Sequence, residues 1–258
     1  MKLFYRKYGT GKPIIILHGL FGQSDNWQTQ AKNLAERGYE IYAVDQRNHG
    51  LSPHDDEFNY KAMSTDLFEL INDLGLNKVI VIGHSMGGKT ALQFAVDHPE
   101  MINKLIVADI APKSYPPHHQ QVFEALQAID FSSIKTRKEA DEMLSKHIAD
   151  DGTKQFLLKN IYWKTDIRLD WHFNIKAIKE NIDAIGAEIE PPRVYTKNDF
   201  GALFIRGENS GYILDSDIPD IRNYFPDSEF VTVEGAGHWL HAEKPKKFLE
   251  EVIRFIEN

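Results

Sequence analysis

The chain has 258 residues, of which 42% are apolar, and a formal net charge of −8 at pH 7. This length is enough for one well-packed α/β domain with an insertion. The acidic balance argues against a nucleic-acid partner, which would need a basic face to neutralise phosphates, but it allows a small anionic substrate held by a local cluster of Lys or Arg.

The absence of cysteine excludes disulfides, thiolate metal sites and cysteine nucleophiles. Met1–Lys12 carries several charges and no apolar segment, so no signal peptide is visible. No apolar run approaches the roughly 20 residues that a membrane-spanning helix needs. We therefore expect a cytoplasmic protein without a membrane span.

The first elements lead to a glycine-rich loop. Lys2–Tyr8 alternates in the manner of an edge strand, and Ile14–Leu17 is typical of a buried strand. H-G-L-F-G follows at 18–22, and its glycines allow the backbone to approach a substrate carbonyl closely. We assign the backbone N–H of Leu20 to an oxyanion hole, with an ordinary strand-to-helix turn as the alternative.

Further helices and a strand follow this loop. The apolar spacing predicts a helix over Asp25–Arg37, a strand over Tyr39–Val44 and a helix over Tyr60–Leu74. Asp45 and Arg47 begin a polar loop after the strand. We interpret both as structural residues that hold this loop by hydrogen bonds rather than as catalytic groups.

The stretch K-V-I-V-I-G-H-S-M-G-G at 78–88 is the most informative part of the chain. Val79–Ile82 predicts a strand buried on both faces, and Met86–Asp97 predicts a helix. A serine on the sharp turn between them needs small neighbours, which the G-x-S-x-G spacing provides. The helix N-terminus directs N–H groups at developing negative charge. We predict Ser85 as the nucleophile and the Met86 N–H as the second oxyanion donor.

An acid follows the next strand. Lys104–Ile110 reads as another buried strand with Asp109 at its carboxyl end, which is where ligands collect in parallel sheets. A carboxylate in so apolar a run needs a partner, because a lone buried charge is very costly. An imidazole would meet that need.

Strands and helices no longer alternate in residues 113–193, where the sequence predicts several helical segments and no convincing strand. Thr136 and Glu139 form a capping box, and Gly186 with Pro191-Pro192 ends the last helix. An all-helical insertion before the penultimate strand predicts a cap that excludes water from the site. Residues 1–112 and 194–258 would then form the core domain.

Aromatic residues are candidates to line a substrate pocket beneath this cap, although aromatic residues at helical spacing are often plain core. The insertion contributes six candidates: Phe123, Phe156, Tyr162, Trp163, Trp171 and Phe173. We assign the pocket to residues from the insertion and from two loops: Phe21, Phe123, Trp163 and Trp239.

The chain ends with two strands, Ala202–Ile205 and Phe230–Val233, and a helix over Glu243–Ile256. Of the eleven histidines, His238 is the best candidate for a base. It lies in a glycine-flanked loop directly after the last strand, from which it can reach Ser85 across the carboxyl edge of the sheet. The other histidines near the site are interpreted as structural or packing groups: His18, His84 and His241.

H-G-L-F-G, G-H-S-M-G-G-K, A-D-I-A-P and G-A-G-H-W together resemble the α/β-hydrolase superfamily. More narrowly, they resemble the esterase group that includes bacterial YbfF and the eukaryotic α/β-hydrolase domain-containing protein 11. The resemblance covers essentially the whole chain. It implies an α/β-hydrolase fold with a mostly parallel central sheet flanked by helices, and a serine esterase or thioesterase that acts on small acyl esters or acyl-CoA.

The motif positions of the group map onto Ser85 as nucleophile, Asp109 as acid and His238 as base, with Leu20 and Met86 as oxyanion donors. The resemblance implies neither a metal nor an organic cofactor. Acyltransferase or C–C bond hydrolase chemistry on the same fold remains an alternative, as does a non-catalytic ligand receptor. The oligomeric state and the acyl chain length do not follow from the sequence.

The chain departs from the wider superfamily in one loop. Most members carry the acid there as G-x-x-D, but this chain has serine at the last position of Gly207–Ser210. The narrower group shares this arrangement, with its acid after the preceding strand. Asp215 and Asp217 stay open as rival acids, because a triad is defined by geometry. Ser210 is expected to be an auxiliary hydrogen-bond partner near the imidazole.

Overall fold

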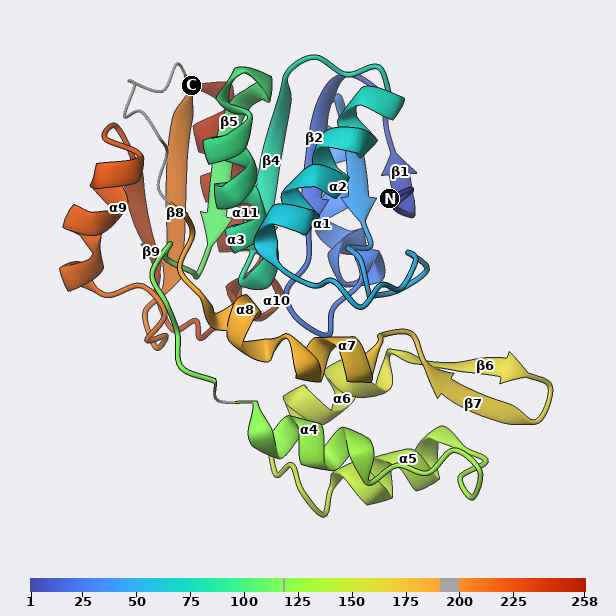
Figure 1. Ribbon diagram of the computed structural model, residues 1–258. Coiled ribbons are helices and arrows are strands. Elements are labelled where there is room, and N and C mark those ends of the chain that lie inside the picture. The colour runs from blue at the N-terminus through green and yellow to red at the C-terminus, as the bar shows by residue number, and fades with distance from the viewer. Residues whose placement is uncertain (118, 191–199) are drawn as a thin grey trace.

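The computed structural model describes residues 1–117, 119–190 and 200–258 (Figure 1). A seven-stranded sheet in the order β1-β3-β2-β4-β5-β8-β9 forms its centre, and all neighbouring strands except the β1–β3 pair run parallel. The strands are β1 (Tyr5–Tyr8), β2 (Lys12–Leu17), β3 (Tyr39–Val44), β4 (Val79–His84), β5 (Ile102–Ala108), β8 (Gly201–Gly207) and β9 (Glu229–Val233).

Alternation along these strands divides the core between the two faces of the sheet. Ile14 and Ile16 of β2 point to one face, and Ile15 and Leu17 point to the other. The helices that pack on the sheet, with the short 3-10 turns η1 to η3, are η1 (Ser24–Trp27), α1 (Gln28–Ala35), α2 (Tyr60–Asp73), α3 (Met86–Asp97), η2 (Pro99–Met101), η3 (Asp215–Asp217), α9 (Ile218–Tyr224), α10 (Leu240–Glu243) and α11 (Pro245–Glu257).

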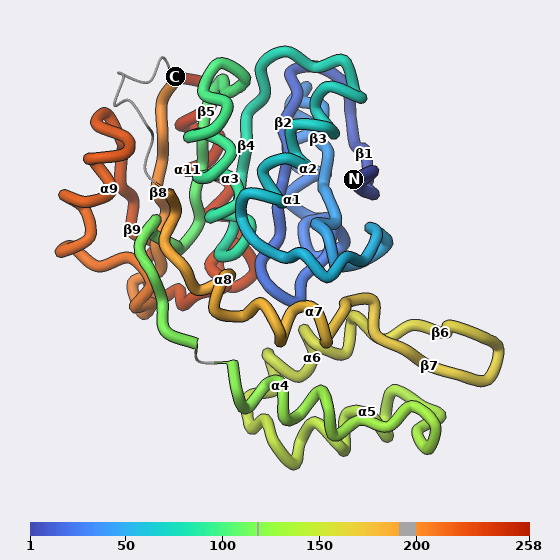
Figure 2. The backbone as a smooth tube through the Cα atoms, in the orientation of Figure 1, coloured from blue at the N-terminus to red at the C-terminus, as the bar shows by residue number. Residues whose placement is uncertain are grey.

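The helices α1 and α11 share a core with one face of the sheet, and α2 and α3 share a core with the other (Figures 1 and 2). The sequence prediction for Met86–Asp97 is confirmed residue for residue. The predicted closing helix over Glu243–Ile256 is present as α11, which begins at Pro245, and the short helix α10 precedes it. The helix α9 was absent from the sequence prediction.

The insertion between β5 and β8 lies beyond the carboxyl ends of the parallel strands (Figure 1). Its elements are α4 (Gln120–Gln127), α5 (Arg137–Leu144), α6 (Asp151–Leu158), β6 (Ile161–Thr165), β7 (Arg168–Trp171), α7 (Ile175–Glu180) and α8 (Ile182–Gly186). The Thr136–Glu139 capping box is present. Pro191-Pro192 lies outside the described residues.

The prediction of an all-helical insertion is wrong in one place. The strands β6 and β7 form an antiparallel hairpin, with Ile161 opposite Trp171 and Trp163 opposite Leu169. Ile161, Leu169 and Trp171 are buried, so the hairpin packs one face on the insertion. The preceding helix α6 ends at Leu158, before Tyr162 and Trp163, which lie in β6.

Candidate active site

Ser85 occupies a sharp turn between β4 and α3, with a φ of 54°. A non-glycine residue in this region stores about 1–3 kcal/mol of backbone strain. The flanking glycines permit the turn: a Cβ at Gly83 would lie 2.2 Å from the carbonyl oxygen of Gly87, and a Cβ at Gly87 would lie 2.4 Å from that of Leu17. The sequence of this turn therefore holds the Ser85 hydroxyl at the carboxyl edge of the sheet.

His238 follows β9 and its ring lies between Ser85 and Asp109. The distance from Nε2 to Ser85 Oγ is 3.0 Å, and that from Nδ1 to Asp109 Oδ2 is 2.8 Å. The ring of Tyr212 stacks on the imidazole with 4.0 Å between centroids. This geometry fits an imidazole that donates from Nδ1 to the carboxylate and accepts the serine proton at Nε2.

Asp109 is fully buried and has a φ of 53° directly after β5. Its Oδ1 accepts a hydrogen bond of 3.0 Å from the backbone N–H of Gly207, and its Oδ2 accepts one from the hydroxyl of Ser210. Ser210 was expected near the imidazole, and its hydrogen bond goes to the carboxylate oxygen that the imidazole also contacts. Hydrogen bonds and the imidazole supply the partners that a buried carboxylate requires.

The two rival acids have other partners. Asp215 pairs with the guanidinium of Arg206 at 2.7 Å, and Asp217 pairs with the ammonium of Lys113 at 2.6 Å. Neither carboxylate contacts His238 in the described structure. The geometry therefore brings Asp109, and not Asp215 or Asp217, to the imidazole.

Leu20 and Met86 both line the cavity at Ser85. Met86 is the first residue of α3, so its N–H has no intrahelical acceptor. Gly19 packs against the serine turn, since a Cβ there would lie 3.3 Å from Ser85 Cβ. Within the described parts of the chain, neither the Leu20 nor the Met86 N–H has a hydrogen-bond acceptor. Both donors are thus available to a ligand.

The other histidines near the site are buried and hold the loops around it. His84 Nε2 lies 2.8 Å from the carbonyl oxygen of His238, and His18 Nε2 accepts the backbone N–H of Gln46 at 3.0 Å. His241 stacks on Trp27 with 4.3 Å between centroids. Burial lowers the pKa of His18 to about 4 and that of His241 to about 3, and burial lowers the pKa of His84 well below its ordinary value.

Asp45 and Arg47 have structural contacts. Asp45 accepts backbone N–H groups from Ser24 at 2.6 Å and from Leu51 at 2.8 Å. Arg47 is nearly buried and forms a two-point ion pair with Asp66. Both side chains are therefore engaged in contacts that hold the loop in place.

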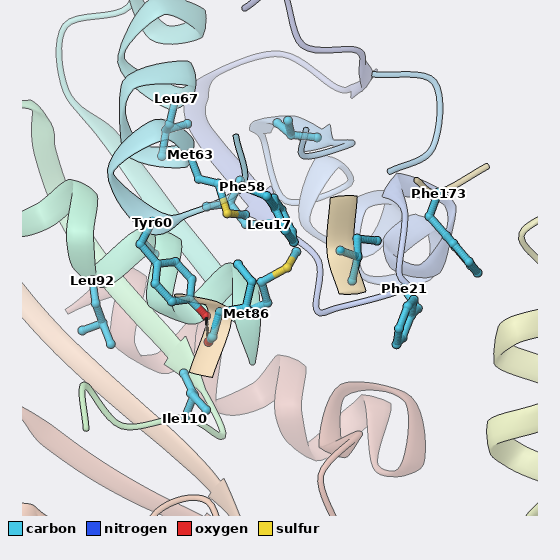
Figure 3. Packing of buried hydrophobic residues seen from close by; sticks show 14 of the residues in the cluster. Leu17, Phe21, Phe58, Tyr60, Met63, Leu67, Met86, Leu92, Ile110 and Phe173 are labelled. Atoms are coloured by element: carbon cyan, nitrogen blue, oxygen red, sulfur yellow. Dashed lines mark hydrogen bonds between the residues drawn. The ribbon is translucent and has the colours of Figure 1, made fainter. Parts of the chain in front are cut away.

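A cavity of about 520 Å³ opens above Ser85, between the core and the insertion. Phe21 and Trp239 line it, together with Phe156, whose ring lies 5.4 Å from that of Trp239. Phe123 is instead core and packs edge-on against Phe21. Figure 3 shows Phe21 with another core residue, Phe173, beside it, at 5.1 Å between centroids.

The prediction that Trp163 lines the pocket is wrong. Trp163 lies on the hairpin strand β6, is 56% exposed, and takes no part in lining the cavity. The hairpin extends away from the carboxyl edge of the sheet (Figure 1). The helical interpretation of this segment did not anticipate the hairpin.

The cavity residues that the sequence analysis did not single out include Lys89, Tyr115 and Tyr212. Lys89 lies four positions after Ser85, and its backbone N–H donates to the Ser85 carbonyl, so its closeness along the chain was the available signal. Tyr115 and Tyr212 lie in loops, and the contact between their rings, at 5.3 Å between centroids, has no signature in the sequence.

No group of three or more His, Asp or Glu side chains within the described ranges is arranged to hold a metal. The same residues contain no helix with the length and apolar character needed to cross a membrane.

Comparison with known proteins agrees with this architecture. The esterase YbfF of Escherichia coli K12 is 36% identical over 247 residues, 95% of this chain and 93% of that protein. The sn-1-specific diacylglycerol lipase ABHD11 of Mus musculus is 37% identical over 250 residues, 94% of this chain and 80% of that protein. A solved structure of a marine microorganism esterase has a TM-score of 0.95 and 46% identity over 99% of both chains. The family model of the alpha/beta hydrolase fold matches residues 12–142. The chain therefore belongs to the α/β-hydrolase family.

Proposed function

We propose that this protein is a serine hydrolase that cleaves carboxylic esters through an acyl-enzyme on Ser85. The observation that carries the proposal is the continuous contact from Ser85 Oγ through the His238 ring to Asp109, at 3.0 and 2.8 Å. Two relatives named as an esterase and a diacylglycerol lipase support ester hydrolysis. A strained serine with a base beside it is the expected arrangement of an activated nucleophile.

Acylation begins when the His238 Nε2 takes the proton of Ser85 as Oγ attacks the ester carbonyl. The negative charge that develops on the carbonyl oxygen is stabilised by the N–H groups of Leu20 and Met86. His238 then gives its proton to the leaving alkoxide, and the C–O bond breaks. Asp109 keeps the ring in the tautomer with Nδ1 protonated and stabilises the imidazolium.

Deacylation repeats these steps with water. His238 takes a proton from the water, the resulting hydroxide attacks the acyl carbonyl, and Ser85 leaves with the proton returned by the imidazolium. Ordered contacts to the Asp109 carboxylate from Gly207 and Ser210 fix its orientation during both steps.

The insertion serves in this proposal as a cap over the acyl group. It covers the carboxyl edge of the sheet, and Phe21, Phe156 and Trp239 supply apolar contacts along the cavity. Exclusion of water strengthens the electrostatic contacts at Ser85. Thioesters fit the same mechanism, since the leaving group is the only part that changes.

The test has two parts. A fluorophosphonate probe should form an adduct that mass spectrometry places on Ser85, and Ser85→Ala should reduce ester hydrolysis at least about a thousandfold. A panel of p-nitrophenyl esters and acyl-CoA thioesters identifies the leaving group. An adduct on another residue, or unchanged hydrolysis by Ser85→Ala, would contradict the proposal. Addition of alcohol acceptors distinguishes hydrolysis from acyl transfer by the products formed.

A further inference from the structure

The cavity contains a buried cation that the proposed mechanism does not use. Lys89 is 1% exposed and lies on α3, with its backbone N–H donating to the carbonyl of Ser85 at 3.0 Å. It lines the same cavity as Ser85. The nucleophile and the lysine therefore lie in the same cavity, one turn of chain apart.

The ammonium group of Lys89 has only neutral contacts within the described residues. It donates to the carbonyl oxygens of Gly186, at 3.3 Å, and Ala187. It also lies over the rings of Tyr115 and Tyr60, at 4.9 and 5.5 Å from their centroids. An ammonium has three donors, so these two carbonyls leave one N–H for another acceptor.

Among the residues that the structure describes, no carboxylate contacts this ammonium directly. The exposed Glu188 acts on Lys89 through its charge and not through a hydrogen bond. Burial lowers the pKa of Lys89 to about 7. A buried charge without a paired anion is costly, and an anion that enters the cavity would relieve that cost.

We propose that Lys89 forms a subsite for a carboxylate at the far end of the acyl chain, so that the preferred substrates are monoesters of dicarboxylic acids. The inference rests on the proposed ester hydrolysis at Ser85. The ester carbonyl would lie at Ser85, the methylene groups would contact the apolar wall, and the carboxylate would accept the remaining N–H of Lys89. Lys89 is thus a specificity-determining residue.

A purely structural role for Lys89 gives a different result. The contacts to Gly186 and Ala187 tie α3 to the end of α8, and without Lys89 the Gly186 carbonyl would keep only the backbone N–H of Tyr115. The loss of these contacts would lower stability and the activity on every substrate alike. The decisive quantity is therefore the ratio of kcat/KM between a carboxylated ester and its neutral counterpart of equal chain length.

The experiment compares 4-nitrophenyl monoesters of succinate, glutarate and adipate with the butanoate, pentanoate and hexanoate esters. The wild-type ratio should exceed one and peak at one chain length. Lys89→Met and Lys89→Gln should lower that ratio at least about tenfold, which corresponds to about 1.4 kcal/mol. Lys89→Gln keeps neutral donors for the two carbonyls and so guards against a failure of Lys89→Met to fold.

Two other lysines serve as matched controls. Lys113 also lies over Tyr115, at 5.3 Å, but it pairs with Asp217 and stays outside the cavity, so Lys113→Met should keep the ratio. Lys159 is an exposed cation that lines the cavity. Suppose that Lys159→Met lowers the ratio of kcat/KM between carboxylated and neutral esters and that Lys89→Met leaves it unchanged. The carboxylate then binds at Lys159, and the inference is wrong.

The remaining outcomes separate the two proposals. A wild-type enzyme that hydrolyses neutral esters but prefers no carboxylated ester at any length overturns the subsite and leaves the proposed function intact. A protein that hydrolyses neither series and forms no probe adduct on Ser85 overturns the proposed function itself.

Discussion

The hydroxyl of Ser210 donates a hydrogen bond to Oδ2 of Asp109. This is the oxygen that also faces His238 Nδ1 at 2.8 Å, while Oδ1 accepts the Gly207 N–H at 3.0 Å. Three donors therefore fix the plane of one carboxylate. In the proposed mechanism Ser210, which follows β8, supports an acid that follows the neighbouring strand β5.

Removal of this hydroxyl should have a moderate effect. Ser210→Ala deletes one neutral hydrogen bond, worth about 1 kcal/mol, so we expect kcat for ester hydrolysis to fall about fivefold. Ser210→Thr keeps a hydroxyl and should retain more activity. Steady-state kinetics on a single p-nitrophenyl ester provides the measurement, and a loss as large as that of Asp109→Asn would show that our assignment of an auxiliary role is mistaken.

Replacement of the acid should have a much larger effect. Asp109→Asn preserves the shape but allows the wrong imidazole tautomer, so kcat should fall by up to about ten-thousandfold while the protein stays folded. Asp215→Asn and Asp217→Asn are the controls and should stay within a few-fold of the wild type. If Asp109→Asn keeps its activity while one of these controls loses it, the acid follows β8.

The elbow should be intolerant of a single methyl group. A Cβ at Gly83 would lie 2.2 Å from the Gly87 carbonyl oxygen, which is backbone and has no room to move, whereas a Cβ at Gly211 would meet nothing within 4 Å. Gly83→Ala should thus lower the free energy of unfolding by about 3 kcal/mol, and Gly211→Ala should leave it nearly unchanged. Urea denaturation of both variants makes the comparison. Equal stabilities would contradict the close approach at Gly83.

Buried neutral histidines should destabilise the fold in acid. The folded-state pKa is about 4 for His18 and about 3 for His49 and His241, below the ordinary value of 6.5. At a pH between the folded-state pKa and 6.5, the unfolded chain binds more protons than the folded chain. The stability that the neutral histidines contribute is therefore fully present above pH 6.5 and is lost as the pH falls below it. Each such histidine contributes a loss of up to about 2 kcal/mol between pH 7 and pH 5.

This loss can be assigned to one residue. His241 Nδ1 is buried without a hydrogen-bond partner within the described structure, so His241→Phe removes a proton site while keeping an aromatic ring against Trp27. The dependence of the unfolding free energy on pH should become shallower by up to one proton in this variant. Urea unfolding at a series of pH values between 5 and 8 measures the slope. An unchanged slope would mean that His241 does not contribute.

Acyl chain length should affect activity through the apolar wall of the cavity. Each methylene that reaches the wall should improve binding by up to about 0.8 kcal/mol until the cavity is full. Phe156→Ala should reduce the gain from acetyl to hexanoyl esters, and Trp163→Ala should leave it unchanged, because Trp163 lies on the exposed hairpin. A flat or falling kcat/KM across the wild-type series would contradict this interpretation.

Local cues explain which parts of the fold could be predicted from the sequence. The helix Met86–Asp97 follows from a buried strand, two glycines and a closing proline, all within the same short segment. The segment Ile161–Trp171 offers apolar and aromatic spacing that suits either a helix or a strand, and only its pairing decides the matter. Trp163 pairs with the buried Leu169 and is nevertheless 56% exposed, so its exposure depends on what covers the hairpin and not on the pairing.

Lys89 illustrates a limit of another kind. A lysine within a helix is ordinarily a surface residue, and its burial here depends on Gly186 and Ala187, nearly a hundred positions away in the sequence. Ser85 and His238 were recognisable because each lies in a motif whose backbone geometry its own neighbours determine. A side chain that becomes functional by being covered from elsewhere carries no such local mark.

The pairing of β5 with β8, with Ala108 beside Ile205, separates the place of the acid in the chain from its place in space. The ends of these two adjacent strands both reach the point where a carboxylate meets the imidazole: Asp109 occupies it, and Ser210 touches it. A carboxylate that follows either strand could therefore reach the imidazole, so the order of such residues along a chain need not reflect their arrangement in space.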